Sequence, residues 1–477
     1  MMKKSILTTL VSLLILSVVA QTNVKRGDRL LKSFRFKDAT EAYKTVVKKA
    51  PNDVDARQRL ARAYVLAEDH TNAEATYADL LKLPNVPAVN HLYYGQELRA
   101  NGKYKEADDP FNLYAAGAPA DVRGKELSNG LSKVLDLAQD KKVYAITNLP
   151  INSTASDMGP AFYKEGITYS ANKGLDASVV RFDNWTGRKF YDIYVVNGDQ
   201  NGNLYDAKLL KGKQPNRRFH EGPVTFATGG KEMYFTRSNY VKCKVGKSKD
   251  RIVKLKIFYA SFDSTKNKWS NITPLPFNSN EYSVGHPSLS KDGKRLYFIS
   301  DMPGGYGETD VYVSYKDGST WGPPINLGKN VNTPGRELFP FIAEDGTLYY
   351  SSDTKTGLGG LDVYSANYAN AEWSNVQNLG APINTNADDF GYIIDSKNEN
   401  GYFASNRTGG QGEDDIYKFK KTGITLCGTV VDARTKDLLP GSEVKLYEGD
   451  KVIGTKNAGA KGEFCFNVLP GKSYKVN

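Results

Sequence analysis

Three glycine-rich stretches hold the residues whose types and spacing could do chemistry. They are 300–312 (SDMPGGYGETDVY), 352–364 (SDTKTGLGGLDVY) and 405–417 (SNRTGGQGEDDIY). Each has a Ser and an Asp ten residues apart, at Ser300/Asp310, Ser352/Asp362 and Ser405/Asp415. A glycine loop beside carboxylates could hold calcium or a phosphate. A catalytic loop is normally used once in a domain, so three regularly spaced copies favour an architectural role, with an ion or phosphate site as the alternative.

These stretches belong to a longer repeat that covers 142–420. A tyrosine of the type "DIY" recurs at Tyr194, Tyr259, Tyr312, Tyr364 and Tyr417, with spacings of 65, 53, 52 and 53 residues. A basic insertion accounts for the longer first spacing. The region then divides into five units, and each contains four short apolar or aromatic strands separated by turns. Four-stranded units repeated around an axis form a β-propeller.

We therefore predict five blades, or six if the insertion hides one. The segment 143–152 (VYAITNLPIN) matches the end of a unit, so it is expected to close the ring against the last blade. The glycine stretches would then connect the second and third strands of three blades. Glycine supplies the positive φ that such turns need, and the Asp would accept backbone hydrogen bonds. In the second blade, Ile257 is expected at the position of this Asp.

The N-terminal part of the chain has a different period. Ala39, Ala73 and Ala107 are 34 residues apart. Each is followed four residues later by an aromatic residue and preceded by a small one, at Tyr43, Tyr77 and Phe111 and at Gly27, Ala61 and Gly95. This pattern predicts pairs of antiparallel helices over 23–119, in which the small residues allow close packing against the aromatic rings. The segment 120–139 is expected to be a capping helix of this 23–139 domain.

The sequence offers no recognisable catalytic, cofactor or metal constellation. His70, His91, His220 and His286 form no HExxH motif, and three cysteines cannot make a four-cysteine zinc site. No GxSxG nucleophile motif occurs. Gly246-Lys247-Ser248 ends like a phosphate-binding loop, but Val241 occupies the position of its first glycine. We therefore assign no catalytic, cofactor or metal residue and expect a protein that is not an enzyme.

The N-terminus indicates an exported protein, and its charge bears on the partners it could meet. Residues 1–20 combine Lys3 and Lys4 with a short apolar run that ends at Ala20, which is typical of a cleaved signal peptide. The formal net charge is +11, from 64 basic and 53 acidic residues. A basic cluster within the insertion comprises Lys242, Lys244, Lys247, Lys249 and Arg251. It is either a solvated hairpin or a contact to lipid phosphate or an acidic partner.

Three family resemblances follow from these motifs. The 34-residue repeat resembles the tetratricopeptide repeat, although Asn23, Arg57 and His91 occupy its tryptophan position. The 53-residue units resemble the WD-like propeller repeats of TolB-type proteins. The segment 424–477 resembles the carboxypeptidase regulatory-like domain, on residues such as Gly428, Asp432 and Pro470-Gly471. That resemblance implies a small β-sandwich, here apparently incomplete, and no peptidase activity.

The resemblances imply two candidate sites. Helix A of each tetratricopeptide repeat lines a concave groove, which would place Lys32, Gln58, Arg62, Gln96 and Arg99 on a surface for an acidic or C-terminal carboxylate group. The alternative is that the groove packs on the protein's own propeller. In the sandwich, Cys427 and Cys465 lie in expected strands 38 residues apart. We predict a disulfide between them, with two free thiols as the alternative, and expect Cys243 to remain free.

The order of domains resembles a PorE-like family of OmpA-type periplasmic proteins in Bacteroidota, some of which belong to the type IX secretion apparatus. The resemblance implies a non-enzymatic scaffold of an outer-membrane-associated complex for secretion or membrane-protein assembly, linked towards peptidoglycan. Protein partners and a periplasmic location are expected, and neither nucleic acid nor a cofactor. The OmpA-like domain is absent from these residues, so peptidoglycan binding is assigned to none of them. The alternative function is a glycan- or peptide-binding module that uses the propeller funnel.

Overall fold

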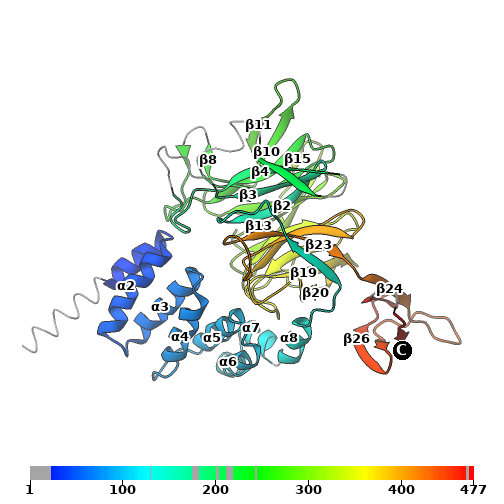
Figure 1. The fold of residues 1–477 in the computed structure, drawn as a ribbon, viewed down its shortest axis with the longest axis horizontal. Helices are drawn as coiled ribbons and strands as arrows, with labels where there is room; N and C mark the ends of the chain where they lie inside the picture. The colour runs from blue at the N-terminus through cyan, green and yellow to red at the C-terminus, as the bar shows by residue number, and fades with distance from the viewer. Residues whose placement is uncertain are drawn as a thin grey trace, which may run out of the picture.

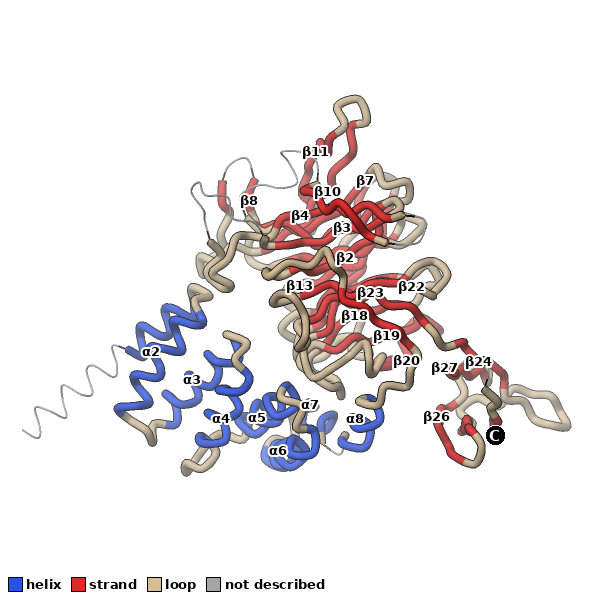
Figure 2. The backbone as a smooth tube through the Cα atoms, viewed as in Figure 1, coloured by secondary structure: helices blue, strands red, loops and turns tan. Residues whose placement is uncertain are grey.

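The computed structural model describes residues 23–128, 130–173, 182–199, 203–210, 219–241, 244–468 and 472–477. A helical region, a large group of four-stranded sheets and a small β-domain follow one another along the chain (Figure 1). The helices lie along one side of the large β-region, and the small β-domain extends from another side of it (Figure 2). The predicted multidomain fold class is confirmed. The signal peptide expected at 1–20 lies outside the described residues.

The helical region is a solenoid of packed helix pairs. A helical segment over 23–32 is followed by α2 (Phe36–Lys49), α3 (Val54–Leu66), α4 (His70–Leu80), α5 (Val89–Ala100), α6 (Tyr104–Gly117), α7 (Val122–Leu127) and α8 (Leu131–Leu137). A Cβ added at Gly27 would lie 2.5 Å from the ring of Tyr43, and one at Gly95 would lie 2.6 Å from the ring of Phe111. The small residues of the repeat therefore let each aromatic ring pack directly on the neighbouring helix.

Local sequence explains where several of these helices begin and end. Asp53, Asp69 and Asp121 precede α3, α4 and α7, and the carboxylate of each accepts a backbone N–H of the first turn. The segment expected to form one capping helix is divided into α7 and α8, because Ser128 adopts an extended backbone between them. None of the helices in the described part of the chain is long and apolar enough to cross a membrane.

The large β-region consists of five sheets, which we call blades 1 to 5. Blade 1 contains β2 (Asp157–Tyr163), β3 (Gly166–Ala171), β4 (Asp192–Gly198) and β5 (Leu204–Leu209). Blade 2 contains β6 (Glu221–Phe226), β7 (Glu232–Ser238), β10 (Leu255–Asp263) and β11 (Lys268–Pro274). Blade 3 contains β12 (Val284–Leu289), β13 (Arg295–Ser300), β14 (Asp310–Asp317) and a divided outer strand, β15 (Thr320–Trp321) and β16 (Ile325–Asn326). Blade 4 contains β17 (Glu337–Ile342), β18 (Leu348–Ser352), β19 (Asp362–Ala369) and β20 (Glu372–Asn378). Blade 5 contains β21 (Asp389–Ile394), β22 (Asn400–Ser405), β23 (Asp415–Lys421) and β1 (Tyr144–Asn148).

The five blades close into a ring. The first strands contact one another in the cyclic order β2, β6, β12, β17, β21 and back to β2. Strand β1 completes blade 5 by pairing antiparallel with β23, in a register that joins Tyr144 to Lys421 and Asn148 to Tyr417. The protein therefore has a five-bladed propeller, closed by its own N-terminal strand, and the six-bladed alternative is excluded.

Neighbouring blades share their hydrophobic cores. One cluster joins Tyr297, Val311 and Val313 of blade 3 to Leu348 and Tyr350 of blade 4. Such side chains come from strands in which apolar and aromatic residues dominate, so each blade buries its faces only against its neighbours. The repeat of aromatic residues in the sequence reflects this requirement.

The small β-domain follows the ring. It contains β24 (Ile424–Thr429), β25 (Glu443–Glu448), β26 (Lys451–Asn457), β27 (Glu463–Val468) and β28 (Lys475–Val476). One sheet pairs β24 with β27, and the other has the order β26-β25-β28. Val444, Leu446, Phe466 and Val468 form the buried core between the two sheets.

The solenoid docks on the propeller through main-chain groups. The Thr356 hydroxyl donates to the Glu126 carbonyl at 2.9 Å, and the Ala381 N–H donates to the Leu137 carbonyl at 2.8 Å. At the other end of the solenoid, Trp185 of blade 1 contacts Phe34 and Phe36, with ring centroids 6.2 Å and 5.5 Å apart. The loops between second and third strands of the blades face the solenoid, and we call this side of the propeller the solenoid face. The opposite side, with the turns between first and second strands, is the turn face.

Candidate functional site

The three glycine stretches are loops on the solenoid face, each closed by its aspartate. The Asp310 carboxylate accepts the backbone N–H groups of Tyr306 at 2.6 Å and Gly307 at 3.0 Å. Asp362 accepts those of Leu358 and Gly359, and Asp415 accepts those of Gln411 and Gly412. In each blade the carboxylate thus ties the loop to the first residue of the third strand.

An asparagine pair extends this arrangement to the outer edge of each blade. The side-chain amides of Asn326, Asn378 and Asn148 donate to Asp310, Asp362 and Asp415 at 2.7, 3.0 and 2.9 Å. A second asparagine, at Asn332, Asn384 and Asn152, bonds both backbone groups of the residue after the aspartate. Each aspartate is therefore one part of a repeated hydrogen-bond network, which gives it an architectural role in this structure.

In blade 2 the structure moves the predicted match between repeat units by one residue. Ile257 exchanges two hydrogen bonds with the side chain of Asn278, as Val311 does with Asn332 in blade 3. Ile257 therefore corresponds to the residue after the aspartate, and the position expected for Ile257 belongs to Lys256. The interpretation that Tyr259 is the repeat tyrosine of this blade was wrong for the same reason, since Phe258 holds that position.

The predicted partner groove is partly covered by the propeller. Lys32 and Arg62 are exposed, and Gln58 and Gln96 are half-buried. Arg99 is only 3% exposed, and its Nη2 donates to the Gly359 carbonyl in the glycine loop of blade 4, at 2.8 Å. The prediction that Arg99 contacts an external partner was wrong, because the protein's own blade 4 occupies that end of the groove.

The docked end of the solenoid also changes the electrostatics of blade 4. Burial raises the pKa of Asp362 to about 7, while the positive charge of Arg99 and the hydrogen bonds from Leu358 and Asn378 oppose this shift. A neighbouring acid, Glu337, begins the first strand of the same blade and accepts hydrogen bonds from Thr333 and Ser352. Burial raises the pKa of Glu337 to about 8.

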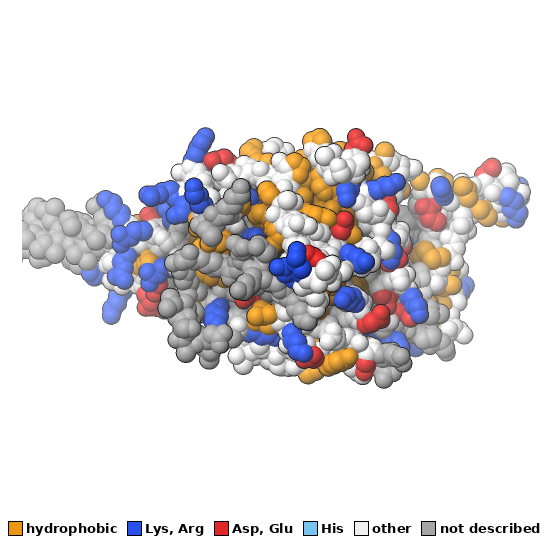
Figure 3. Space-filling model, turned by 90° about the horizontal axis from the view of Figure 1, so that it is seen from above, with side chains coloured by type: hydrophobic (Ala, Val, Ile, Leu, Met, Phe, Trp, Pro, Cys, Tyr) orange, Lys and Arg blue, Asp and Glu red, His pale blue; other side chains and the backbone are white. Residues whose placement is uncertain are grey.

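The basic cluster lies around a short hairpin of β8 (Tyr240–Val241) and β9 (Lys244–Val245). Lys244, Lys247, Lys249 and Arg251 are exposed, whereas Lys242 lies outside the described residues. On the face seen in Figure 3, the Lys and Arg side chains drawn in colour are scattered and interspersed with Asp and Glu. Neither of the two interpretations of this cluster is favoured by these positions.

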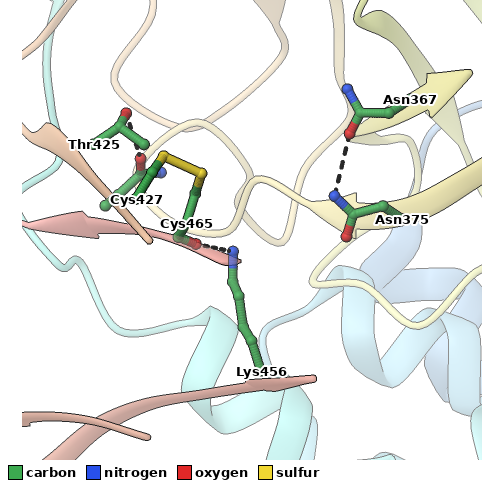
Figure 4. The surroundings of a disulfide bond; sticks show 7 residues. Asn367, Asn375, Thr425, Cys427, Lys456 and Cys465 are labelled. Carbon is green, nitrogen blue, oxygen red and sulfur yellow. Dashed lines mark hydrogen bonds between the residues drawn. A yellow bond between two sulfur atoms is a disulfide. The ribbon is translucent and has the colours of Figure 1, made fainter. Parts of the chain in front are cut away.

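The two sandwich cysteines are joined. Cys427 and Cys465 face each other across the β24–β27 pair, with Cα atoms 4.1 Å apart, and form a disulfide (Figure 4). Lys456 donates to the Cys465 carbonyl at 2.7 Å, which ties β26 to the bridged pair. The structure thus contains the disulfide that the sequence interpretation expected. Cys243 lies outside the described residues.

The propeller channel contains a cavity that the sequence interpretation missed. Each first strand has a bulge in its middle, and at each bulge one residue has a positive φ. These residues are Gly159, Gly222, His286, Phe339 and Gly391. Between this level and the turn face lies a cavity of about 750 Å³. Aligning the five first strands would have pointed to this site. Three of them have glycine at the bulge, whereas the other two have His286 and Phe339 there.

The histidines do not gather into one centre. The His70 Nδ1 lies 2.9 Å from a Glu97 carboxylate oxygen, and the His220 Nε2 lies 3.5 Å from Asp183. Burial lowers the pKa of His286 to about 3, so its imidazole is neutral at physiological pH. In the described part of the chain, no group of three or more His, Cys, Asp or Glu residues could hold a metal ion.

Comparison with known proteins identifies the repeat family of the solenoid. The tetratricopeptide repeat family model matches residues 30–93. A search of curated proteins finds no match to the sequence. Tetratricopeptide repeats suggest interaction with other proteins.

Solved structures are similar to separate parts of the chain. MamA from Desulfovibrio magneticus is 24% identical, with 24% of this chain and 64% of that chain covered and a TM-score of 0.23, so this chain spans less than two thirds of MamA. A gluconolactonase from Xanthomonas campestris is 12% identical over 58% of this chain and 89% of that chain, with a TM-score of 0.31. A thermostable family-43 glycoside hydrolase is 14% identical over 66% of this chain and 96% of that chain, with a TM-score of 0.36.

Proposed function

We propose that the protein is a non-enzymatic periplasmic scaffold that holds protein partners within an outer-membrane-associated complex. The observation that carries this proposal is the docking of the solenoid on its own propeller. Main-chain carbonyls of Ala100, Glu126 and Leu137 accept hydrogen bonds from the propeller, and Arg99 donates one in return. Contacts to main-chain groups at several points fix the relative position of two domains more firmly than one flexible ion pair would.

A fixed pair of domains suits a scaffold, because partner surfaces on both domains keep a constant spacing. The solenoid contacts loops of blades 1 and 4 on the solenoid face. The remaining part of the solenoid groove exposes Lys32 and Arg62, and the Arg62 guanidinium lies 6.0 Å from the centroid of the Tyr93 ring. An exposed cation beside an aromatic ring is a common feature of protein interfaces. We propose this Lys32–Arg62 surface as the partner site.

The PorE-like resemblance of the sequence supports a role in secretion or outer-membrane protein assembly, with a link towards peptidoglycan. The experiment is native purification of the tagged full-length protein from its own cells, followed by mass spectrometry. We expect recovery of specific envelope proteins that are lost from Lys32→Glu/Arg62→Glu protein with an unchanged melting temperature. Recovery of the same proteins by this variant would contradict the proposed site.

A further inference from the structure

The channel cavity is built on backbone conformations that two of its residues rarely adopt. Gly159, Gly222 and Gly391 take the positive φ of their bulges without cost. His286 and Phe339 occupy the equivalent positions with φ of 49° each. A positive φ is uncommon for any residue with a Cβ and is an outlier for a bulky one. Since glycine serves three of the five blades, the side chains of His286 and Phe339 have a purpose other than forming the bulge.

These two side chains form the floor of the cavity. Their rings stack with centroids 4.0 Å apart, and the Phe339 N–H donates to the His286 Nδ1 at 3.3 Å. The ring of Phe339 also reaches Phe390, 4.8 Å away. Because Nδ1 is the acceptor, the proton of the neutral imidazole is on Nε2. No residue in the described ranges accepts a hydrogen bond from this Nε2, and His286 lines the cavity.

The walls are apolar rings. Pro160, Pro223, Pro287 and Pro340 line the cavity from four different blades, together with the aromatic side chains of Phe162, Phe226 and Phe341. Proline has no backbone N–H, so these positions offer no main-chain donor, and their side chains are C–H surface. Thr225 and Ser288 also line the cavity, and the hydroxyl of each accepts a backbone N–H from the next blade. Each hydroxyl can still donate its own proton to a ligand.

The charged side chains that line the mouth on the turn face are Lys164 and Lys291 against Glu165, Glu344 and Asp395, so the mouth has one excess negative charge. Lys291 of blade 3 forms an ion pair with Glu344 of blade 4, at 2.7 Å. Lys164 is followed directly by Glu165 in the turn of blade 1. An anionic ligand would therefore find no countercharge here. The excess carboxylate, Asp395, is engaged in its own turn, where it accepts the Glu399 N–H at 2.9 Å and the Asn400 side-chain amide at 3.0 Å, which weakens it as a site for a cation. A purely apolar ligand would leave the Nε2–H of His286 without a partner, which disfavours it.

We propose that this cavity binds an uncharged carbohydrate, such as the terminal residues of a glycan. One face of a pyranose ring is C–H surface, which matches the proline and phenylalanine rings, and its hydroxyl groups accept from the His286 Nε2–H and from Thr225 and Ser288. The volume of about 750 Å³ lies within the usual range of small-molecule sites. The site opens on the turn face, so a bound glycan leaves the solenoid and its docking contacts untouched.

The test is calorimetric titration of the full-length protein with neutral trisaccharides, namely cellotriose, maltotriose and chitotriose. We expect one-to-one binding of at least one of them, with an affinity that changes little between low and high salt. His286→Gly and Phe339→Gly should each weaken it by about tenfold or more. Glycine relieves the positive φ, as it does in blades 1, 2 and 5, so His286→Gly should keep its melting temperature. Phe339→Gly also removes a buried ring that packs with Leu361 and Phe390, so its melting temperature should fall, and its binding is measured well below that temperature.

Two further variants make the result decisive. His286→Asn retains an N–H donor and tolerates a positive φ, so it should bind more tightly than His286→Gly, and it replaces that variant if His286→Gly does not fold. Tyr315→Ala changes an exposed propeller residue away from the cavity and should bind like the wild type.

The proposal is overturned if no trisaccharide binds at millimolar concentration, or if binding is unchanged in the His286 and Phe339 variants. It is also overturned if N-phenyl-1-naphthylamine or an unstructured peptide occupies the cavity while the trisaccharides do not.

Discussion

The Arg99 Nη2 donates to the Gly359 carbonyl at 2.8 Å, across 260 residues of chain. This bond joins the third repeat-derived helix pair of the solenoid, α5 and α6, to a glycine loop of blade 4. Arg99 is buried at 3% exposure, and its guanidinium also lies 5.7 Å from the centroid of the Phe111 ring. One side chain therefore links the interior of the solenoid to the solenoid face of the propeller.

Removal of this side chain should loosen the two domains. Arg99→Ala leaves the Gly359 carbonyl without its donor at a buried site, and we expect a loss of about 1–3 kcal/mol of unfolding free energy. Hydrogen exchange at 353–361 should increase at the same time. Arg62→Ala, at an exposed position of the same groove, is the matched control and should change neither measurement. Equal exchange in the Arg99→Ala protein and the wild type would show that the contact does not hold the domains together.

The aspartates of the glycine loops should stabilise their own blades without any ion. Asp362→Ala removes the acceptor for Leu358, Gly359 and Asn378, so we expect a cost of about 1–3 kcal/mol. The cost should be the same with and without chelator, as measured by thermal unfolding. Asp317→Ala, which changes an exposed residue of blade 3, should have little effect. If millimolar calcium raises the wild-type melting temperature and Asp362→Ala abolishes the rise, the loops are ion sites, since a ligand of the folded state stabilises it.

Buried carboxyl groups should make the propeller less stable as the pH rises. The pKa of Glu337 is raised to about 8 by burial, whereas an unfolded glutamate titrates near 4.3. Between these values the folded state binds more protons than the unfolded state. The stability contributed by protonated Glu337 is therefore complete below about pH 4 and is lost progressively up to about pH 8.

Glu337→Gln removes this proton linkage while it retains a group of similar shape. We subtract the unfolding free energy of the wild type from that of Glu337→Gln at each pH. This difference should be larger at pH 8.5 than at pH 5 by about 1–3 kcal/mol. Urea unfolding followed by tryptophan fluorescence at the two pH values measures this difference. Glu399→Gln, at an exposed turn, provides the control. A pH-independent difference between Glu337→Gln and the wild type would refute the assignment.

The disulfide should stabilise the small β-domain. It closes a loop of 38 residues between Cys427 and Cys465, for which chain-entropy arithmetic gives about 3–4 kcal/mol. Cys465→Ser should therefore expose 424–477 to limited proteolysis and leave the propeller intact. Alkylation of both cysteines in unreduced native protein, detected by mass spectrometry, would contradict the bond.

The sequence predicted the repeated parts of this fold because each repeat has the same local requirement. In blades 3, 4 and 5 an aromatic strand and an Asp recur at 52 or 53 residues, and an Asn bonds each Asp, since these blades use them to pack and to close their loops. The pairing of Asn148 with Asp415 could be predicted for the same reason, because the first strand has the pattern of a blade's last strand. The groove residues could be placed on helix A by their repeat positions.

The remaining features depend on contacts between distant segments. Whether Arg99 meets a partner or Gly359 depends on how two domains dock, which no repeat pattern specifies. The basic insertion in blade 2 shifted the alignment by one residue, so Ile257 was predicted at the aspartate position that Lys256 holds. The positive φ of His286 and Phe339 follows from the bulges of the ring, and their residue types alone would have predicted ordinary strand positions.

The recovery of partners through the solenoid groove tests the central claim most directly. Wild-type protein, Lys32→Glu/Arg62→Glu protein and a charge-matched control, Lys418→Glu/Lys420→Glu, should be tagged and purified natively, and the bound envelope proteins quantified by mass spectrometry. We expect the wild type and the control to recover the same partners, and the groove variant to lose them by at least tenfold with its melting temperature unchanged. Equal recovery by all three proteins, or recovery of no specific partner by the wild type, would contradict a scaffold that acts through this groove.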